Sequence, residues 1–198
     1  MVEKAILDLA PETVERHLDL GTGTGRILEL LAGRTEHAQG VDLSREMLAV
    51  ARANLDSAGL SHCQVRQADI TQLPFPAETF DLVTLHQVLH YLDDPVRAIE
   101  AATAMLRPGG MLLIVDFAPH DEETLRRDHQ HRRLGFSDTQ TESWLKSAGL
   151  SPRAIRHLSG DPLTVTLWSA VKAPAAANTD TAPVLTKPAV GRTLENTV

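Results

Sequence analysis

The segment Leu18–Gly25, with the sequence LDLGTGTG, restricts the fold of this chain more than any other. Its apolar run ends in alternating glycines, and a helix-type pattern begins directly after them at Arg26. Glycine permits positive φ and lets a ligand approach the backbone, while the free N–H groups of a following helix attract a carboxylate or phosphate. The segment predicts a strand-to-helix turn, which either holds a small anionic group or has no ligand.

The rest of the chain alternates apolar strands with helical patterns, which is typical of βαβ units and a parallel sheet. Seven strands are predicted, at about 16–20, 39–42, 64–67, 82–85, 111–117, 154–158 and 163–170, and the last two form a hairpin. Ser44 is predicted to cap a helix that Gly59 ends. Asp94 caps the next helix, which Pro108 stops. A Thr139-x-x-Glu142 capping box opens a later one.

Composition indicates one domain over 1–172, followed by a flexible tail rich in Ala, Pro and Thr at 173–198. The net charge of −7 argues against nucleic-acid binding by this chain alone. No apolar run reaches the roughly 20 residues that span a bilayer, and no signal peptide is visible, so a cytoplasmic protein without membrane contact is predicted. The single cysteine, Cys63, is predicted to be a small buried apolar residue.

Two acidic residues end predicted strands near the glycine-rich turn. Asp42 ends the second strand, close to the ~20-residue offset at which an acidic side chain takes ribose hydroxyls. Taken alone it could merely cap a helix, although Ser44 already offers itself for that role. Asp69 ends the third strand, where it could accept a bond from an adenine amino group or act only as a turn residue. Together they predict a nucleoside site.

With these residues the chain resembles the class I methyltransferases that use S-adenosylmethionine (SAM), over 14–172. The resemblance rests on five motifs in the family's order: Leu18–Gly25, Gly40–Ser44, Ala68–Ile70, Phe80–Thr84 and Leu106–Leu113. It implies an α/β fold, a Rossmann-like three-layer sandwich around a seven-stranded, mostly parallel sheet whose last strand is antiparallel. The cofactor implied is SAM, with S-adenosylhomocysteine (SAH) as the product.

The resemblance also implies roles for particular residues. The three glycines would border the methionine end, Asp42 would hold the ribose, and Asp69 would contact the adenine between Leu43 and Ile70. Asp19, His86 and Gln87 would lie near the sulfonium and amino group. The full set of implied cofactor residues is Asp19, Gly21, Thr22, Gly23, Gly25, Asp42, Leu43, Met47, Ala68, Asp69, Ile70, His86 and Gln87.

A nicotinamide-dependent oxidoreductase is the competing interpretation. Its fingerprint, G-x-G-x-x-G/A, needs a third small residue where the helix meets a pyrophosphate. Here that position is Arg26 or Leu28, depending on the glycine from which it is counted. SAM has no phosphate, so the same turn is compatible with SAM.

Catalysis by such a domain consists mainly of positioning, so no catalytic residue is assigned. His86, His90 and His120 lie at or after strand ends and are candidate bases, with a structural histidine as the alternative for each. No metal is predicted at Asp128–His131, because the ligand set is incomplete; a solvated charged face is favoured there. The arginines at 126, 127, 132 and 133 could hold an anionic acceptor or a partner.

Two segments, 116–121 and 132–137, narrow the resemblance to bacterial proteins in which a methyltransferase-like domain follows an ArsR-type winged-helix domain. The core also resembles ubiquinone and menaquinone C-methyltransferases, and arsenite methyltransferases, whose cysteine cluster a lone Cys63 cannot supply. Only about fifteen residues precede the first strand, so N-terminal cofactor-covering helices are expected to be missing. The function predicted is methylation of a small-molecule acceptor; the alternative is SAM/SAH sensing that acts on an upstream regulatory domain or a homodimer partner.

Overall fold

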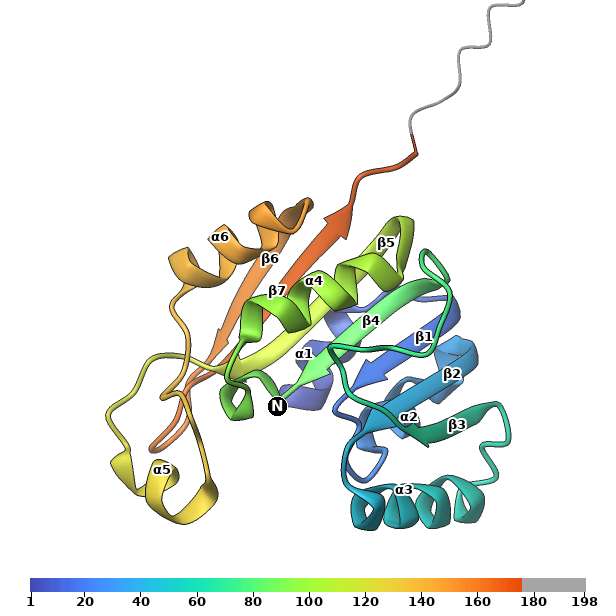
Figure 1. The fold of residues 1–198 in the computed structure, drawn as a ribbon, viewed down its shortest axis with the longest axis horizontal. Helices are drawn as coiled ribbons and strands as arrows, with labels where there is room; N and C mark the ends of the chain where they lie inside the picture. The colour runs from blue at the N-terminus through green and yellow to red at the C-terminus, as the bar shows by residue number, and fades with distance from the viewer. Residues whose placement is uncertain (176–198) are drawn as a thin grey trace, which may run out of the picture.

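The computed structural model describes residues 1–175, and its helices and strands alternate along the chain (Figure 1). The strands are β1 (Val14–Leu20), β2 (Thr35–Asp42), β3 (Cys63–Gln67), β4 (Phe80–His86), β5 (Leu106–Phe117), β6 (Leu150–Leu158) and β7 (Val165–Lys172). The α-helices are α1 (Val2–Leu9), α2 (Arg26–Leu31), α3 (Arg45–Ser57), α4 (Pro95–Met105), α5 (Glu123–His129) and α6 (Asp138–Ser147). Two short 3-10 helices are η1 (Ala32–Arg34) and η2 (Leu89–Tyr91).

The seven strands form one sheet in the order β3-β2-β1-β4-β5-β7-β6. The first five are parallel, and β7 is antiparallel to both of its neighbours, β5 and β6. Both the α/β fold class and the antiparallel last strand are therefore confirmed. Because β1 to β4 run in the same direction, their carboxyl ends meet at one edge of the sheet (Figure 1). The chain order reverses between β1 and β4, which is where open α/β sheets bind ligands.

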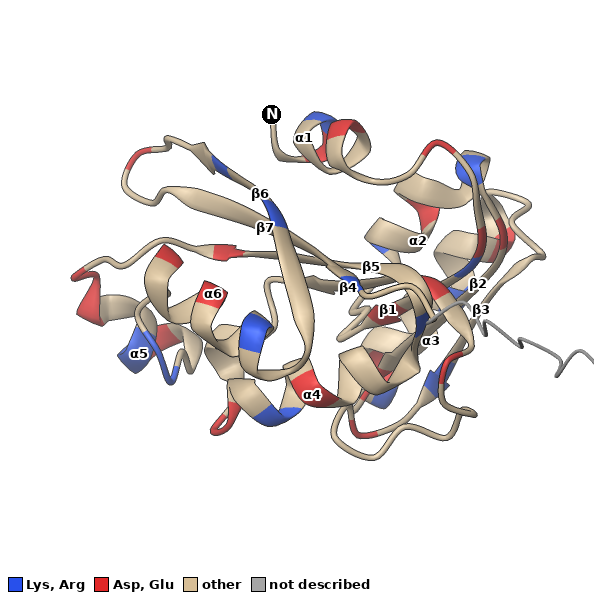
Figure 2. Ribbon diagram, turned by 90° about the horizontal axis from the view of Figure 1, so that it is seen from above, with Lys and Arg blue, Asp and Glu red and all other residues tan. Residues whose placement is uncertain are grey.

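Helices cover both faces of the sheet and complete the three layers (Figure 2). On one face, α1 and α2 pack against the centre of the sheet, and α3 packs with α2 over β2 and β3. On the other face, α4 and α6 enclose the largest apolar cluster, in which Ile99, Leu145 and Trp168 are almost fully buried. Burial of side chains of this size contributes roughly 1.5–3 kcal/mol each, so these clusters hold the strand ends in place.

Cys63 lies in the apolar cluster beneath α3 and is 6% exposed. Burial raises the pKa of its thiol to about 11, because the charged thiolate is poorly solvated there. The prediction of a small buried residue is confirmed.

Two predicted helix ends are wrong. Helix α6 begins at Asp138, and Ser137 caps it by accepting a hydrogen bond from the backbone N–H of Gln140; the predicted Thr139-x-x-Glu142 box lies inside the helix. Helix α4 ends at Met105 rather than at Pro108, because Leu106 is already extended and pairs with Phe80 of β4. The first error came from a competing cap two residues earlier in the sequence, and the second from strand pairing that a local pattern does not reveal.

Helix α1 was not predicted. Its buried residues, Ala5 and Ile6, pack against the cluster that α2 and β7 share, and its Glu3 forms an ion pair with Arg26 at the start of α2. One helix thus covers the sheet in the stretch where the sequence was expected to lack any.

No helix within residues 1–175 has the length and apolar character needed to cross a membrane. The predicted tail lies outside the described residues, apart from its first three.

Candidate functional site

A cavity of about 1020 Å³ opens at the carboxyl edge of the sheet, where β1, β2 and β4 end. It contains every predicted cofactor residue except Gly25 and Ala68. Its lining residues are Asp19, Gly21, Thr22, Gly23, Thr24, Arg26, Ile27, Asp42, Leu43, Ser44, Met47, Asp69, Ile70, Thr71, His86, Gln87, Val88, Tyr91, Leu92, Asp93, Asp94, Arg97 and Gln130. Another cavity, of about 880 Å³, includes Arg16 and Arg66 in its lining and none of the predicted site residues.

The glycine-rich turn forms one wall of the cavity. Gly21, Gly23 and Gly25 have φ values of +73°, +53° and +81°, which glycine adopts without steric cost. A Cβ on Gly21 would lie 2.5 Å from Cγ2 of Val88, whereas a Cβ on Gly23 would meet nothing within 4 Å. Gly23 therefore leaves its backbone open to a ligand, while Gly21 allows the turn to pack against the segment after β4.

Asp42 joins the end of β2 to both the glycine-rich turn and α3. Its Oδ2 atom accepts a hydrogen bond from the Gly23 N–H at 2.9 Å, and its Oδ1 atom accepts one from the Ser44 N–H, also at 2.9 Å. The Ser44 hydroxyl in turn caps α3 by accepting from the Met47 N–H. Asp42 is thus not the helix cap, and each of its oxygens keeps a lone pair for a further donor.

Asp69 lies across the cavity mouth from the glycine-rich turn. Its Oδ1 atom accepts hydrogen bonds from the N–H and hydroxyl of Thr71, both at 2.8 Å. These bonds lower the pKa of Asp69, so the side chain is ionised at neutral pH. Asp69 therefore does shape a turn, as the alternative interpretation held. The turn uses one oxygen, and Oδ2 accepts no hydrogen bond from residues 1–175.

Apolar side chains beside the two acids form the rim of the cavity. Ile70 is 6% exposed and belongs to the core, whereas Leu43 is 63% exposed and Met47 is 47% exposed. Large apolar side chains left this open beside a cavity are suited to cover a flat apolar ligand surface.

Asp19 ends β1 at the floor of the cavity and is 1% exposed. Burial raises the pKa of Asp19 to about 6. Its Oδ1 atom accepts a hydrogen bond from the Thr84 hydroxyl at 2.6 Å, while Oδ2 is buried without a partner among the described residues. A buried carboxylate oxygen in this state is costly unless a cation or donor contacts it.

The three candidate histidines occupy different environments. His86, at the end of β4, lines the cavity, and burial lowers its pKa, so the ring is neutral at pH 7. His90 is 2% exposed and does not line the cavity. His120 does not line the cavity either, and its Nδ1 atom accepts a hydrogen bond from the Glu122 N–H. Of the three candidate bases, only His86 therefore lines the cavity.

His90 is held by Asp116, which is fully buried at the end of β5. Its Nδ1 atom lies 2.7 Å from Oδ1 of Asp116, whose carboxylate also accepts hydrogen bonds from the backbone N–H groups of Leu89 and Phe117. The rings of His90 and His131 lie 4.1 Å apart. His131 is 8% exposed, so the prediction of a solvated face at Asp128–His131 is wrong for this residue, which packs back onto η2.

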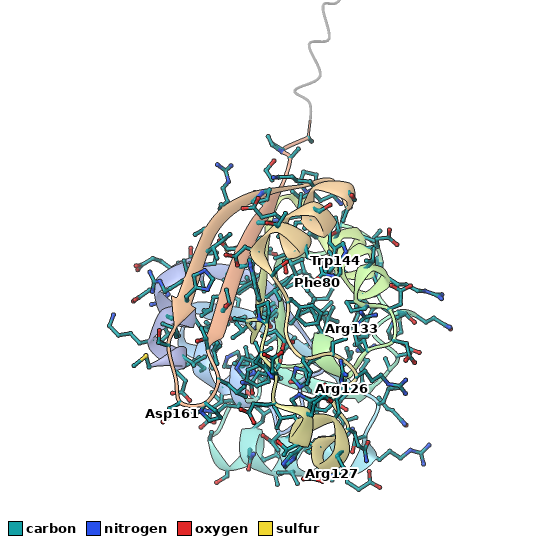
Figure 3. The ribbon with its side chains drawn as sticks, turned by 90° about the vertical axis from the view of Figure 1, so that its left-hand side faces the viewer. Phe80, Arg126, Arg127, Arg133, Trp144 and Asp161 are labelled. Atoms are coloured by element: carbon teal, nitrogen blue, oxygen red, sulfur yellow. The ribbon has the colours of Figure 1, made fainter. Side chains whose placement is uncertain are left out.

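The four arginines of this region, three of which are labelled in Figure 3, contact acids or carbonyl oxygens. Arg126 and Arg127 lie on α5 and pair with Glu123 and Asp128, and Arg132 pairs with Asp93. Arg133 donates to the carbonyl oxygens of Leu92 and Asp93. The pairs of Arg126 and Arg127 lie within α5, and those of Arg132 and Arg133 connect the residues after α5 to the residues after η2. In the part of the chain that the structure describes, no group of three His, Cys, Asp or Glu side chains is arranged to hold a metal.

Several lining residues were not predicted. Arg26 and Ile27 belong to the first turn of α2, Tyr91 and Arg97 to the segments after β4, and Gln130 to the end of α5. Arg26 could have been predicted as a lining residue, because it directly follows the glycine-rich turn. No local pattern indicates Gln130, because the fold of a segment distant in sequence brings it to the cavity.

Known proteins match the chain over this same region. Residues 18–114 match the sequence model of a family described as "Methyltransferase domain". A demethylmenaquinone methyltransferase from Clavibacter sepedonicus is 35% identical over 121 residues, which cover 61% of this chain and 49% of that protein. A phosphatidylethanolamine N-methyltransferase from Cereibacter sphaeroides is 36% identical over 111 residues, covering 56% and 54%. The chain thus spans about half the length of these relatives.

The fold is also similar to solved structures. The YcgJ protein from Bacillus subtilis superposes with a TM-score of 0.76 at 20% identity, covering 86% of this chain and 97% of that one. At this identity the likeness concerns the fold. The strand order, the glycine-rich turn with its cavity and the matched residues lead to one conclusion: residues 18–114 of this chain form a methyltransferase domain.

Proposed function

We propose that this chain binds SAM in the 1020 Å³ cavity and transfers its methyl group to a small-molecule acceptor. The observation that carries the proposal is the unpartnered Oδ2 atom of Asp19 at the cavity floor. SAM bears an ammonium group that would satisfy this oxygen. The proposal also treats 1–172 as the unit that holds the site.

The lining residues fit the remaining parts of SAM. The free lone pairs of Asp42 would accept the ribose hydroxyls, and Oδ2 of Asp69 would accept the adenine amino group. Leu43 and Ile70 would cover the two faces of the adenine. The open backbone of Gly23 would lie along the methionine end. This assignment gives a ligand partner to the free oxygens of Asp19, Asp42 and Asp69 and to the exposed side chain of Leu43.

SAM supplies a methyl group on a sulfonium that is already activated as a leaving group, so the protein contributes mainly position. Gln87 follows β4 in a left-handed conformation, with φ +51°, and its N–H donates to the Val115 carbonyl oxygen at 2.7 Å. This contact fixes the backbone beside His86 at the cavity wall. Because His86 is neutral at pH 7, it can accept the proton of an acidic acceptor.

The acceptor end is formed by the residues after β4 and α5. Tyr91 and Gln130 line it, and both are exposed in the described chain. The two relatives above are named for different acceptors, a quinone precursor and a phospholipid amine.

Calorimetric titration with SAM and SAH tests the proposal directly. Asp42→Ala should weaken binding of both by about 10–100-fold, because donors of the ribose lose a charged acceptor. Asp56→Ala, on the exposed end of α3 and outside the cavity, serves as the matched control and should bind like the unaltered protein. Failure of the unaltered protein to bind either ligand would refute the site. Binding of SAH in preference to SAM, with no turnover of any acceptor, would favour the sensor alternative.

A further inference from the structure

Three side chains form a buried polar chain beneath the methionine end of the proposed site. His17 and Asp19 lie two residues apart on β1 and so point to the same face, and Thr84 is the residue of β4 paired with Asp19. The Nε2 atom of His17 lies 2.8 Å from the Thr84 hydroxyl, which lies 2.6 Å from Oδ1 of Asp19. None of the three is more than 2% exposed. Ordinary packing of a central sheet does not require polar residues at these positions.

The number of available protons determines which group donates in each of these two hydrogen bonds. An ionised carboxylate only accepts, so the single hydroxyl proton of Thr84 goes to Asp19. The hydroxyl oxygen must then accept its second bond from His17, which places a proton on Nε2. Burial lowers the pKa of His17 to about 3, so the ring is neutral and Nδ1 carries none. Nδ1 is buried without a partner in the described chain.

The chain of bonds supports only one of the two oxygens of Asp19. Oδ2 has no partner within residues 1–175, and Asp19 lines the cavity. Burial raises the pKa of Asp19 to about 6, the Thr84 bond opposes this, and the charge of Asp42 adds to the rise. Thr22 also lowers this pKa a little, although its hydroxyl does not reach hydrogen-bond geometry with Asp19.

The other basic side chains that line the cavity do not supply a positive charge to the free oxygen of Asp19. Arg26 on α2 is engaged by Glu3 and Glu29 through ion pairs. His86 on β4 has a pKa lowered by burial, so it adds no positive charge at pH 7. Arg97 on α4 lies near Asp69, whose pKa it helps to lower. The ligand ammonium is therefore the charge that best matches Asp19.

We propose that His17 and Thr84 are positioning residues, which hold the Asp19 carboxylate ionised and oriented for the ammonium group of the methyl donor. Binding of SAM then depends on the protonation of Asp19, while binding of the nucleoside part does not. This inference rests on the proposed function.

The test compares SAM with 5′-methylthioadenosine, which keeps the nucleoside but lacks both the amino-acid group and the sulfonium charge. SAH, a neutral thioether that carries the amino-acid group, is titrated beside them and should respond to the variants as SAM does. Thr84→Val keeps the shape of the side chain and removes the hydroxyl, so it should weaken SAM binding about tenfold or more, since a bond to a charged group is lost. Binding of 5′-methylthioadenosine should not change. Thr84→Ser restores the hydroxyl and should restore affinity for SAM.

The pH profile gives a readout that a purely structural role would not move. The ligand ammonium has an ordinary pKa of about 8, so SAM affinity should be level between roughly pH 6.5 and 7.5. As the pH falls through about 6, Asp19 takes up a proton and SAM affinity should fall. In Thr84→Val this fall should begin at a higher pH, and in His17→Leu at an intermediate one. Asp19→Asn should bind SAM weakly without such a fall.

Thr103→Val is the matched control, because its hydroxyl is buried in α4, bonds to the Ile99 carbonyl oxygen and lies outside the cavity. It should leave both affinities unchanged. Equal SAM affinity and pH profile in Thr84→Val and the unaltered protein would overturn the inference, as would loss of both ligands in a folded Thr84→Val. If the unaltered protein bound neither ligand, the proposed function itself would fail.

Discussion

Gly21 shows how closely one residue of the turn is fitted to its neighbours. Its left-handed backbone, φ +73°, would cost an L-residue roughly 1–2 kcal/mol, and its missing Cβ leaves room for Val88. Gly59 also has a left-handed backbone, with φ +70°, but a Cβ there meets nothing within 4 Å. A comparison of substitutions at the two positions therefore separates the cost of backbone strain from that of steric crowding.

We expect Gly21→Ala to lower the free energy of unfolding by more than Gly59→Ala does, and to weaken SAM binding at least tenfold. The added methyl group must push Val88 or the turn out of place, whereas Gly59→Ala carries only the backbone cost of ~1–2 kcal/mol. Chemical denaturation and calorimetry measure the two quantities. Equal losses of stability in both variants, with SAM binding intact, would contradict the assigned role of Gly21.

At this scale the sequence predicted residues whose position follows from a local motif. Asp42, Asp69 and the glycines are such residues, since each ends a strand or forms a turn. The sequence did not predict the contact between the rings of His90 and His131, because 40 residues of chain and a return loop separate them. The support of Asp19 by His17 and Thr84 depends in the same way on the register between β1 and β4.

Among the elements, β5 and η2 are tied together by the carboxylate of Asp116. It accepts hydrogen bonds from the N–H groups of Leu89 and Phe117 and from His90. The backbone N–H groups of Arg132 and Arg133 then donate to the His90 carbonyl oxygen, which docks the segment after α5. Asp116 therefore supports the acceptor end of the cavity without lining it.

We expect Asp116→Asn to lower the free energy of unfolding by about 3 kcal/mol, because an amide nitrogen would face donors that a carboxylate accepts. Amide hydrogen exchange at Leu89 and His90 should quicken. Asp121→Asn, an exposed site in the same loop, is the control and should change neither quantity. Unchanged exchange in Asp116→Asn would show that packing alone holds η2.

Strands were predicted better than helix ends, for a physical reason. The buried strands β4 and β5 carry apolar runs that mark them wherever their partners lie, and the edge strands β3 and β6 were found from weaker patterns. Helix ends depend on competition between caps and on pairing outside the helix, as Ser137 and Leu106 show. The missed α1 carries apolar residues at Val2, Ile6 and Leu9 on one face, but eight residues give a weak periodic signal.

For the whole molecule, two buried groups of the site make opposite contributions to stability as pH changes. The pKa of His17 falls from 6.5 unfolded to about 3 folded, so its contribution to stability is complete above pH 6.5 and is lost as pH falls. The pKa of Asp19 rises from 3.8 to about 6, so its contribution is complete below pH 3.8 and is lost as pH rises. Between pH 3.8 and 6 the contribution of His17 to stability increases with pH, while that of Asp19 decreases.

We expect Asp19→Asn to lose stability more steeply than the unaltered protein as pH falls from 6 to 4. The variant still loses the contribution of His17 as pH falls, but it lacks the compensating gain from protonation of Asp19. Denaturation of both proteins without ligand, at half-unit steps of pH, measures the difference, in which all other titrating groups cancel. Parallel curves for the two proteins would mean that Asp19 titrates normally in the folded state.

The layered architecture as a whole followed from the strand–helix alternation and the resemblance, since parallel strands require crossing helices. The return of residues 118–137 onto η2 did not follow, because its backbone and arginine side-chain bonds reach partners near η2 that lie far away in sequence, and no local pattern marks them.

The open apolar rim has a thermodynamic consequence of its own. Leu43 and Met47 leave much of their surface in water, and a ligand that covers them returns that water to the bulk. The heat capacity should therefore decrease on binding, and the binding enthalpy should grow more favourable as temperature rises. A rim of two side chains thus sets how the site responds to temperature.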